Sequence, residues 1–134
     1  MIGAGLRFGR YEVGDRIGKG GFGVVHFARD VELGRELAIK FLRPEYQTRP
    51  TVVQRFLQEA RAAARIGHPG IVTVFECGLV GGTGLRADGT AFIAMELLKG
   101  QNLADRLADR GRLPAALALA IGRQLASALA SAHE

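Results

Sequence analysis

The chain reads Ile17-Gly18-Lys19-Gly20-Gly21-Phe22-Gly23-Val24-Val25 near its start. This stretch contains a G-x-G-x-x-G spacing with a β-prone run on either side. Glycine has no Cβ, so the backbone amides of such a loop approach phosphate oxygens closely and donate to them. We therefore expect a phosphate-binding loop between two antiparallel strands, with Phe22 at its tip folding over the phosphates and excluding water.

Two other phosphate-binding motifs also begin with closely spaced glycines. A Walker A loop requires Gly-Lys-Ser/Thr after four intervening residues, and that ending is absent here. A dinucleotide-binding fingerprint requires a helix to open at the last glycine. The residues Val24, Val25, His26 and Phe27 favour a strand instead, so a loop between strands fits best; a comparison of ATP with NAD separates it from the dinucleotide alternative.

The segments around this loop predict a meander of strands and one long helix. Apolar alternation favours strands, whereas the recurrence of apolar residues from Val52 to Ala64 has helical spacing, with Thr51 as its cap and Gly67 and Pro69 as its end. A glycine-rich hairpin loop is expected at 78–90. The predicted strands are 11–17, 24–29, 37–42, 71–77 and 91–97.

The C-terminal part of the chain is helical by the same criteria. Asn102 is placed to cap a short helix over 103–110, which Gly111 ends, and Pro114 fits the first turn of a longer helix to about His133. Four residues spaced four apart give this helix an apolar stripe that needs a partner surface, so we expect possible self-association through it. The stripe consists of Leu117, Ile121, Leu125 and Leu129.

Composition excludes several classes of protein. With 134 residues, 48% hydrophobic and 23% charged, the chain is globular and amounts to one domain or part of one. The net charge of +5 comes from scattered arginines without interleaved aromatics, which argues against nucleic-acid binding. Cys77 is the only cysteine, so no intrachain disulfide forms. Because no signal peptide and no run of about 18 apolar residues stands out, we expect a soluble cytoplasmic chain without a membrane segment.

Lys40 and Glu59 are the candidate catalytic residues. In the strand 37–42 the side chains alternate, so Ala38, Lys40 and Leu42 share one face. Ala38 is small enough to leave space for a flat base, and an ammonium on that face requires a partner such as phosphate or a carboxylate. Glu59 lies at the border of the apolar face of the following helix. Taken singly, each residue also fits an ordinary solvent-exposed position.

The order of glycine loop, strand lysine and helix glutamate resembles the small lobe of bacterial eukaryotic-like (Hanks-type) serine/threonine protein kinases. Shorter matches extend the resemblance over almost the whole chain. They are Phe8-Gly9-Arg10-Tyr11 at the first strand, Ala38-Ile39-Lys40 for V-A-I-K, His68-Pro69-Gly70-Ile71-Val72 for H-P-N-I-V, the strand and hinge from Ala91 to Leu98, Gly100 with Leu103, and the long helix around 127–133.

The resemblance implies an α+β fold: a small lobe at 1–98 with a five-stranded antiparallel sheet and one long helix, then two helices of an incomplete large lobe at 99–134. It implies ATP as cofactor, with Lys40 on the α and β phosphates and paired with Glu59. The adenine would lie between Ile17, Val25, Ala38 and Leu98. Met95 would stand behind it, and the carbonyl of Glu96 and the amide of Leu98 would pair with its edge.

The family's H-R-D loop, its Asn and its D-F-G motif would all follow Glu134. The resemblance therefore implies that the Mg²⁺ ligands lie beyond this chain, and none is assigned within it. We expect the 134 residues alone to be inactive, and the full-length parent to phosphorylate a protein substrate. The alternative is a non-catalytic nucleotide-binding or interaction module.

Overall fold

The computed structural model describes residues 3–80 and 89–134. Most of the predicted hairpin loop, residues 81–88, lies outside the described residues. The described chain divides into two compact units. One comprises the chain through Arg65 together with Val72–Leu97, and the other comprises Ile66–Ile71 with Leu98–Glu134.

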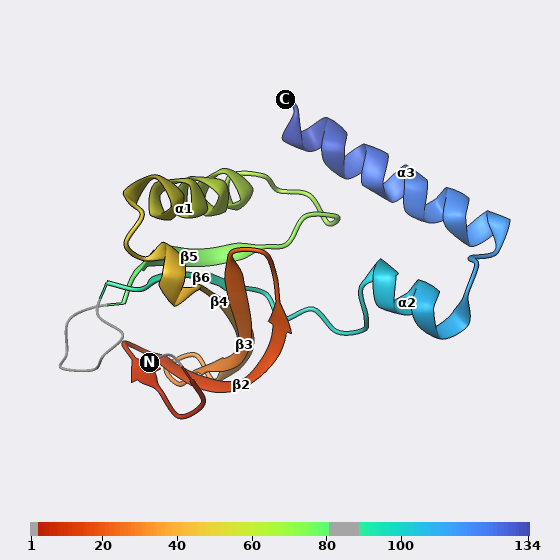
Figure 1. The fold of residues 1–134 in the computed structure, drawn as a ribbon. Coiled ribbons are helices and arrows are strands. Elements are labelled where there is room, and N and C mark those ends of the chain that lie inside the picture. The colour runs from red at the N-terminus through yellow and green to blue at the C-terminus, as the bar shows by residue number, and fades with distance from the viewer. Residues whose placement is uncertain (1–2, 81–88) are drawn as a thin grey trace. The chain divides into compact units, whose positions relative to one another are not determined.

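The first unit is built on one antiparallel sheet (Figure 1). The sequence predicts five strands, and the described residues form six. The additional strand is a two-residue segment that pairs with β2 after a turn at Gly9, whose φ is +53°. In the order β1-β2-β3-β4-β6-β5, the strands are β1 (Arg7–Phe8), β2 (Tyr11–Lys19), β3 (Gly23–Asp30), β4 (Arg35–Leu42), β6 (Ala91–Met95) and β5 (Val74–Leu79).

The two faces of the sheet carry different apolar clusters. The helix α1 (Pro50–Ala64) packs on one face against β5 and β6. Its buried side chains Phe56, Leu57 and Ala60 meet Leu42 and Ile93 there. On the opposite face lies an apolar cluster whose buried members are Tyr11, Val13, Ala28, Leu37, Ile39, Phe41, Val80, Phe92 and Ala94.

The short strand β1 exists because its aromatic residue completes the second cluster. The ring of Phe8 lies 5.0 Å from that of Phe92, 5.4 Å from that of Tyr11 and 6.0 Å from that of Phe41, in tilted or edge-on geometry. Aromatic rings prefer such arrangements to face-to-face stacking. A two-residue strand carries no periodic pattern, so sequence reasoning missed it.

Several predicted boundaries are wrong by a few residues. The helix α1 starts at Pro50 with Arg49 as its N-cap, so Thr51 is inside the helix and is not the cap. Proline fits the first helical position because its missing N–H has no partner there in any case. A short 3₁₀ turn, η1 (Pro44–Tyr46), precedes α1. β5 begins at Val74 instead of Ile71, and β6 ends at Met95 instead of Leu97.

The second unit contains α2 (Leu103–Arg110) and α3 (Ala115–Ala132). As predicted, Asn102 caps α2: its side chain accepts a hydrogen bond of 2.8 Å from the amide of Asp105. Gly111 ends α2 at φ +70°, a backbone conformation that favours glycine. Within this unit, Nε2 of His68 lies 2.9 Å from Oγ of Ser127, which ties the segment Ile66–Ile71 to α3.

The expectation that no segment is long and apolar enough to cross a membrane does not hold for the helix α3. Its 18 residues have a mean hydropathy of 1.3, which satisfies a criterion of length and composition alone. Arg123 lies at the middle of the helix. An arginine at the bilayer centre costs about 2.5–3.5 kcal/mol on insertion scales, which disfavours a membrane-spanning role.

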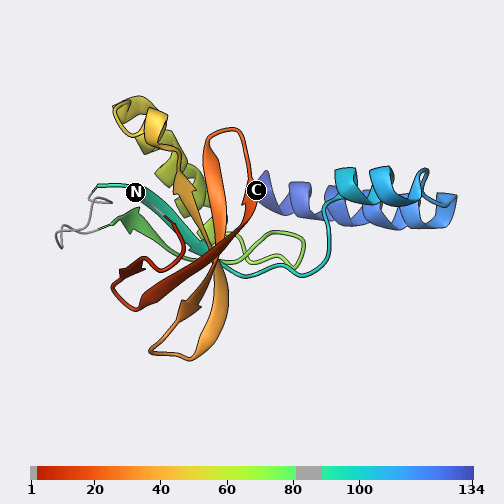
Figure 2. The ribbon, with the colours of Figure 1, turned by 60° about the horizontal axis from the view of Figure 1, so that its bottom comes forward.

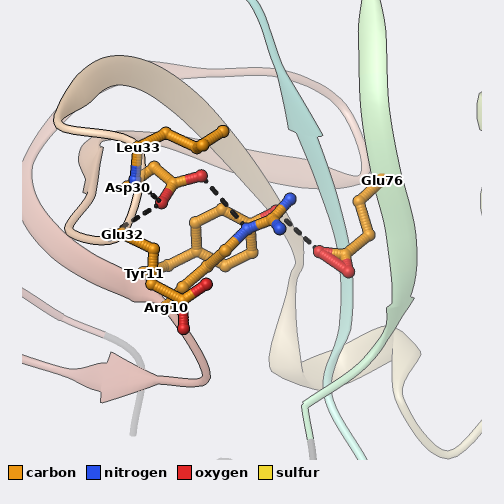
Figure 3. Close-up of polar contacts among 6 residues, drawn as sticks. All are labelled: Arg10, Tyr11, Asp30, Glu32, Leu33 and Glu76. Carbon is orange, nitrogen blue, oxygen red and sulfur yellow. Dashed lines mark hydrogen bonds and ion pairs between the residues drawn. The ribbon is translucent and has the colours of Figure 1, made fainter.

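The sheet is strongly twisted, as antiparallel sheets of this length are (Figure 2). The curl brings β2 close to β5, although β3, β4 and β6 separate them in the sheet order. The hydroxyl of Tyr11 on β2 donates a hydrogen bond of 2.6 Å to the carboxylate of Glu76 on β5 (Figure 3). This bond therefore joins strands that are not neighbours in the sheet.

A buried carboxylate completes this polar group. Asp30 is 1% exposed, and one of its oxygens lies 3.1 Å from Nε of Arg10. Its other oxygen accepts hydrogen bonds from the amides of Glu32 and Leu33, each at 3.0 Å. The guanidinium of Arg10 also lies over the ring of Tyr11, with its carbon 5.4 Å from the ring centre. The β3–β4 turn and the start of β2 are thereby held together.

Replacing Tyr11 by Phe should flatten the alkaline dependence of stability. Burial, and then the hydrogen bond to Glu76, raise the pKa of Tyr11 to about 12 from its usual value of 10.0. Because its pKa is higher in the folded chain than in the unfolded chain, the protonated tyrosine stabilises the fold. This contribution is complete below about pH 10 and is lost as the pH rises toward 12. The free energy of unfolding of Tyr11→Phe should be lower by about 1–2 kcal/mol at pH 8 and fall less steeply between pH 10 and 12.

Urea unfolding at a series of pH values measures this slope. Tyr46→Phe is the matched control, because it leaves the bond between Tyr11 and Glu76 in place and should retain the steeper alkaline slope. Equal slopes for the wild type and Tyr11→Phe would mean that the pKa of Tyr11 is not raised in the fold. Equal free energies of unfolding at pH 8 would mean that the bond does not stabilise the fold.

Candidate functional site

The glycine loop is a hairpin connection between β2 and β3. The amide of Gly20 donates to the carbonyl of Gly23 over 2.8 Å, which closes the turn. Lys19 is the exposed last residue of β2, and Gly18 pairs with Val25 of β3. Because a strand starts at Gly23, no helix follows the third glycine, and the dinucleotide-binding fingerprint is excluded.

The tip of the loop turns toward the connection between β4 and α1. The carbonyl of Phe22 accepts a hydrogen bond of 2.8 Å from the amide of Arg43. The Phe22 ring lies edge-on to the ring of Tyr46, with 5.0 Å between their centres, while the residue remains 54% exposed. Sequence reasoning placed Phe22 at the tip and missed Tyr46, because nothing in the local pattern links residues 22 and 46.

The side chain of Lys40 lies on the face of the sheet that α1 covers. In the register of the sheet, Lys40 is opposite Val25 on one side and Ile93 on the other. Directly opposed residues point to the same face, and Ile93 is part of the cluster under α1. The ammonium of Lys40 lies 6.0 Å from the centre of the Phe56 ring of α1. The predicted sharing of one face by Ala38, Lys40 and Leu42 is confirmed by this register.

Lys40 and Glu59 line one cavity of about 160 Å³. Its walls come from the glycine loop, β4 and α1. Ion pairs with a nitrogen–oxygen distance of 4.0 Å or less join Arg10 to Asp30 and Arg43 to Glu45 among the described residues, and the pair of Lys40 and Glu59 is not among them. The two candidate catalytic side chains thus face the same space, and their direct pairing stays a prediction. The remaining lining residues are Phe22, Thr51, Val52, Arg55 and Phe56.

Gly23 is the glycine whose missing Cβ matters most for this cavity. A Cβ at position 23 would lie 2.7 Å from Cε of Lys40 and 3.1 Å from the carbonyl oxygen of Phe41. At these distances the lysine stem would have to move aside, and the carbonyl, which belongs to a paired strand, would have to shift by a few tenths of an ångström. The glycine therefore gives the stem of Lys40 its path across β3. At Gly21, in contrast, a Cβ would meet nothing within 4 Å.

Three of the residues predicted to contact adenine adjoin Lys40 on the same face of the sheet. Ala38 pairs with Met95, and Val25 pairs with Lys40, so Val25, Ala38 and Met95 form one patch with the lysine. Ala38 is 4% exposed. Ile17 lies at an irregularity of β2 and is 53% exposed.

Two more of the predicted contacts lie beyond the end of β6. The amide of Glu96 donates to the carbonyl of Thr73, and its carboxylate accepts from the amide of Thr73, both over 2.9 Å. These bonds extend the pairing of β6 with the chain before β5 and fix the backbone at Glu96. Leu98 belongs to the second unit and is 68% exposed. The adenine contacts of both residues stay predictions.

Sequence reasoning missed part of the cavity wall. Phe56 and Val52 were predicted only as members of the apolar face of α1, and Thr51 was predicted as a cap. Arg55 was not predicted as part of the site, although its position one turn before Glu59 on the helix was the available signal. Arg55 and Glu59 both line the cavity because the border of α1, and not only its apolar stripe, faces the glycine loop.

These features define a class of protein. The small lobe of protein kinases has this arrangement: a curled antiparallel sheet with a glycine hairpin, and a strand lysine and a helix glutamate that face one cavity. A family model described as the protein kinase domain matches residues 11–134. The chain belongs to the bacterial Hanks-type serine/threonine protein kinase family.

Named relatives agree with this assignment. The chain is 36% identical over 126 residues to the serine/threonine-protein kinase PrkC of Bacillus subtilis, covering 94% of this chain and 18% of PrkC. It is 39% identical over 126 residues to the serine/threonine-protein kinase PknA of Mycobacterium tuberculosis, covering 93% and 28%. The crystal structure of the Mycobacterium tuberculosis PknI kinase domain matches with a TM-score of 0.80 and 30% identity, over 99% of this chain and 52% of that one. The chain thus spans about half of a solved kinase domain and a smaller share of its curated relatives.

Substituting Gly23 by Ala should displace Lys40 and destabilise the first unit. The added methyl group collides with Cε of Lys40 and with a strand carbonyl, and such overpacking typically costs about 1–3 kcal/mol. Gly21→Ala is the matched control, because its methyl group enters open space and should change the free energy of unfolding by less than about 0.5 kcal/mol. Urea unfolding of both variants checks this, and equal stabilities would contradict the packing argument.

Proposed function

We propose that this chain binds ATP on the α1-covered face of its sheet and forms part of a serine/threonine protein kinase. The observation that supports the proposal most directly is the cavity beneath the glycine loop, where the ammonium of Lys40 and the carboxylate of Glu59 face the same space. The sheet register adds a patch of Val25, Ala38 and Met95 beside the lysine, where a flat apolar base would fit.

The size of the cavity indicates which part of the nucleotide it takes. A volume of about 160 Å³ is below the roughly 300–1,000 Å³ of a complete small-molecule site. In the proposed arrangement the cavity admits phosphate groups alone, and the base lies outside it on the strand patch. The open space at Gly21 leaves room for phosphate oxygens beside the loop backbone.

Each residue of the site has a physical role in this proposal. ATP supplies the transferable phosphoryl group. Lys40 offsets negative charge at the α and β phosphates, and Glu59 holds the lysine in position by pairing its carboxylate with the ammonium. The loop amides donate to phosphate oxygens. Phe22, whose ring packs edge-on against Tyr46 beside the cavity, excludes water from the phosphates.

Transfer of phosphate to serine or threonine of a protein substrate is proposed for the whole protein. The 134 residues contain neither His-Arg-Asp nor Asp-Phe-Gly, the motifs that supply the catalytic base and the magnesium ligands in kinases. Among the described residues, no group of three or more His, Cys, Asp or Glu is arranged to hold a metal ion. We propose that Mg²⁺ is held by residues outside this chain, and that the domain acts in the cytoplasm, where ATP is available.

A non-catalytic nucleotide-binding or interaction module remains the second candidate. The glycine loop, Lys40 and Glu59 favour a catalytic parent, because each is needed for productive phosphate geometry. Self-association through α3 also stays a proposal. It is supported by the exposure of Leu125 and Leu129, at 55% and 56%, since an exposed apolar stripe favours association.

Binding of ATP should depend on the charge of Lys40. Lys40→Met retains the apolar stem and removes the ammonium, so the affinity for the ATP analogue AMP-PNP should fall by about tenfold or more, which corresponds to the loss of one charge-assisted hydrogen bond. Lys99→Met is the matched control, because it removes the same charge from the second unit and should leave the affinity within about twofold, as surface charges typically do. Isothermal titration calorimetry measures both variants, and NAD should bind neither the variants nor the wild type.

Residues 1–134 alone should not transfer phosphate. With radiolabelled ATP, Mg²⁺ and a general protein substrate, no incorporation above the level of Lys40→Met is expected, because the catalytic base and metal ligands of the family are missing from the sequence. Magnesium-dependent incorporation that Lys40→Met abolishes would refute this half of the proposal.

A further inference from the structure

In the stretch where β2 and β3 pair, from Tyr11 to Lys19 on β2 and from Val24 to Asp30 on β3, β2 has two more residues than its partner. On β2 and β3, Val13 pairs with Ala28, then Arg16 with His26, then Gly18 with Val25. The register therefore shifts twice, between Val13 and Arg16 and between Arg16 and Gly18. Each shift inserts one extra residue on β2. Such bulges bend the strand that carries them and increase its local twist.

The first bulge is built around a glycine. Gly14 and the residue after it have no partner in the pairing of β2 with β3. A Cβ at position 14 would lie 2.9 Å from Cδ1 of Phe27 and 3.3 Å from the carbonyl oxygen of Phe27. The backbone of β2 thus approaches β3 as closely as a glycine permits. A bulged backbone group also needs a hydrogen-bond partner outside the regular ladder.

His26 supplies that partner from the neighbouring strand. Its Nδ1 lies 2.9 Å from the carbonyl oxygen of Gly14. A carbonyl only accepts, so Nδ1 carries a proton and donates it. The residue is 6% exposed, and its ring lies edge-on to that of Phe41, with 5.8 Å between their centres. The imidazole is therefore held in one orientation by packing while its N–H is directed at the bulge.

His26 also lies directly behind the proposed nucleotide surface. It pairs with Ile39 of the cluster opposite α1, whereas the preceding residue, Val25, pairs with Lys40 on the α1 side. Between the two bulges, His26 pairs with Arg16. His26 therefore lies opposite the bent part of β2 that leads into the loop from Gly20 to Phe22.

We propose that His26 is a positioning residue: its hydrogen bond to Gly14 fixes the bulge in β2 and thereby the direction of the glycine loop over the phosphate cavity. The part of this inference that concerns ATP rests on the proposed function. A purely structural histidine would contribute to stability through its packing and leave the loop unchanged when an equally sized apolar residue replaces it.

Two substitutions separate the hydrogen bond from the packing. His26→Leu removes the donor and retains an apolar side chain, whereas His26→Asn provides an amide nitrogen near the position of Nδ1. Leu37→Val is the matched control, because Leu37 is 1% exposed in the same cluster, lies on β4 and makes no contact with the bulge through the pairing. Thermal unfolding identifies variants of comparable stability.

The first measurement is hydrogen exchange of the amides of Gly20 and Gly23 by NMR, without nucleotide. His26→Leu should accelerate their exchange by about fivefold or more relative to Leu37→Val, the ratio that corresponds to one net hydrogen bond, and His26→Asn should restore most of the protection. Equal exchange in His26→Leu and Leu37→Val would overturn the proposal whether or not the chain binds ATP. So would equal exchange in His26→Leu and His26→Asn, because the amide would then have restored nothing.

The second measurement is the affinity for AMP-PNP. It should fall by about fivefold or more in His26→Leu and remain close to that of the wild type in His26→Asn and Leu37→Val. An unchanged affinity in a folded His26→Leu, with a wild type that binds, overturns the positioning role. A wild type that does not bind AMP-PNP refutes the proposed function instead, and the exchange rates alone then decide whether His26 positions the loop.

Discussion

The site depends on the placement of one ammonium group, that of Lys40, on a largely apolar face of a sheet. An unpaired cation there is unfavourable, and the chain limits the cost by directing the group into a small cavity that also contains the carboxylate of Glu59. Gly23 makes this path possible, because any side chain at that position would occupy the space of the lysine stem. The glycines of the loop, which are proposed to bind phosphate, therefore also make room for the lysine.

The sheet separates two kinds of chemistry. Its α1 face carries the cavity and the patch beside it, and its opposite face carries an aromatic cluster closed by the bond between Tyr11 and Glu76. That bond connects strands that are far apart in the sheet order and that the curl of the sheet brings together. The glycine loop continues β2, so the constraint that we propose for His26 would act on the α1 face through a strand and not through a side-chain contact.

Much of the fold follows from local pattern. The short helix from Leu103 with its Asn102 cap, and the strand that begins near Leu37, agree with the structure because capping and alternation act within a few residues. The boundaries that fail have a different cause. Thr51 is an acceptable cap by composition, yet Pro50 already occupies the first helical position. The start of β5 at Val74 is set by its pairing with Met95, which no local pattern reports.

Family membership was indicated by the sequence, because residue type, order and spacing are sufficient to specify a glycine loop, a strand lysine and a helix glutamate. The roles proposed for Lys40 and Glu59 follow from the same pattern. The tertiary structure decided which residues surround them: Tyr46 against Phe22, Arg55 in the cavity wall, and His26 against Gly14. Phe22 and Tyr46, and likewise Gly14 and His26, are 12 or more residues apart in the sequence, and Arg55 lies at the border of its helix. Only the packing of strands and helix brings these side chains to the site. The physical reason is that a sequence pattern encodes which face a side chain occupies, whereas its neighbours on that face are chosen by the register and twist of the whole sheet.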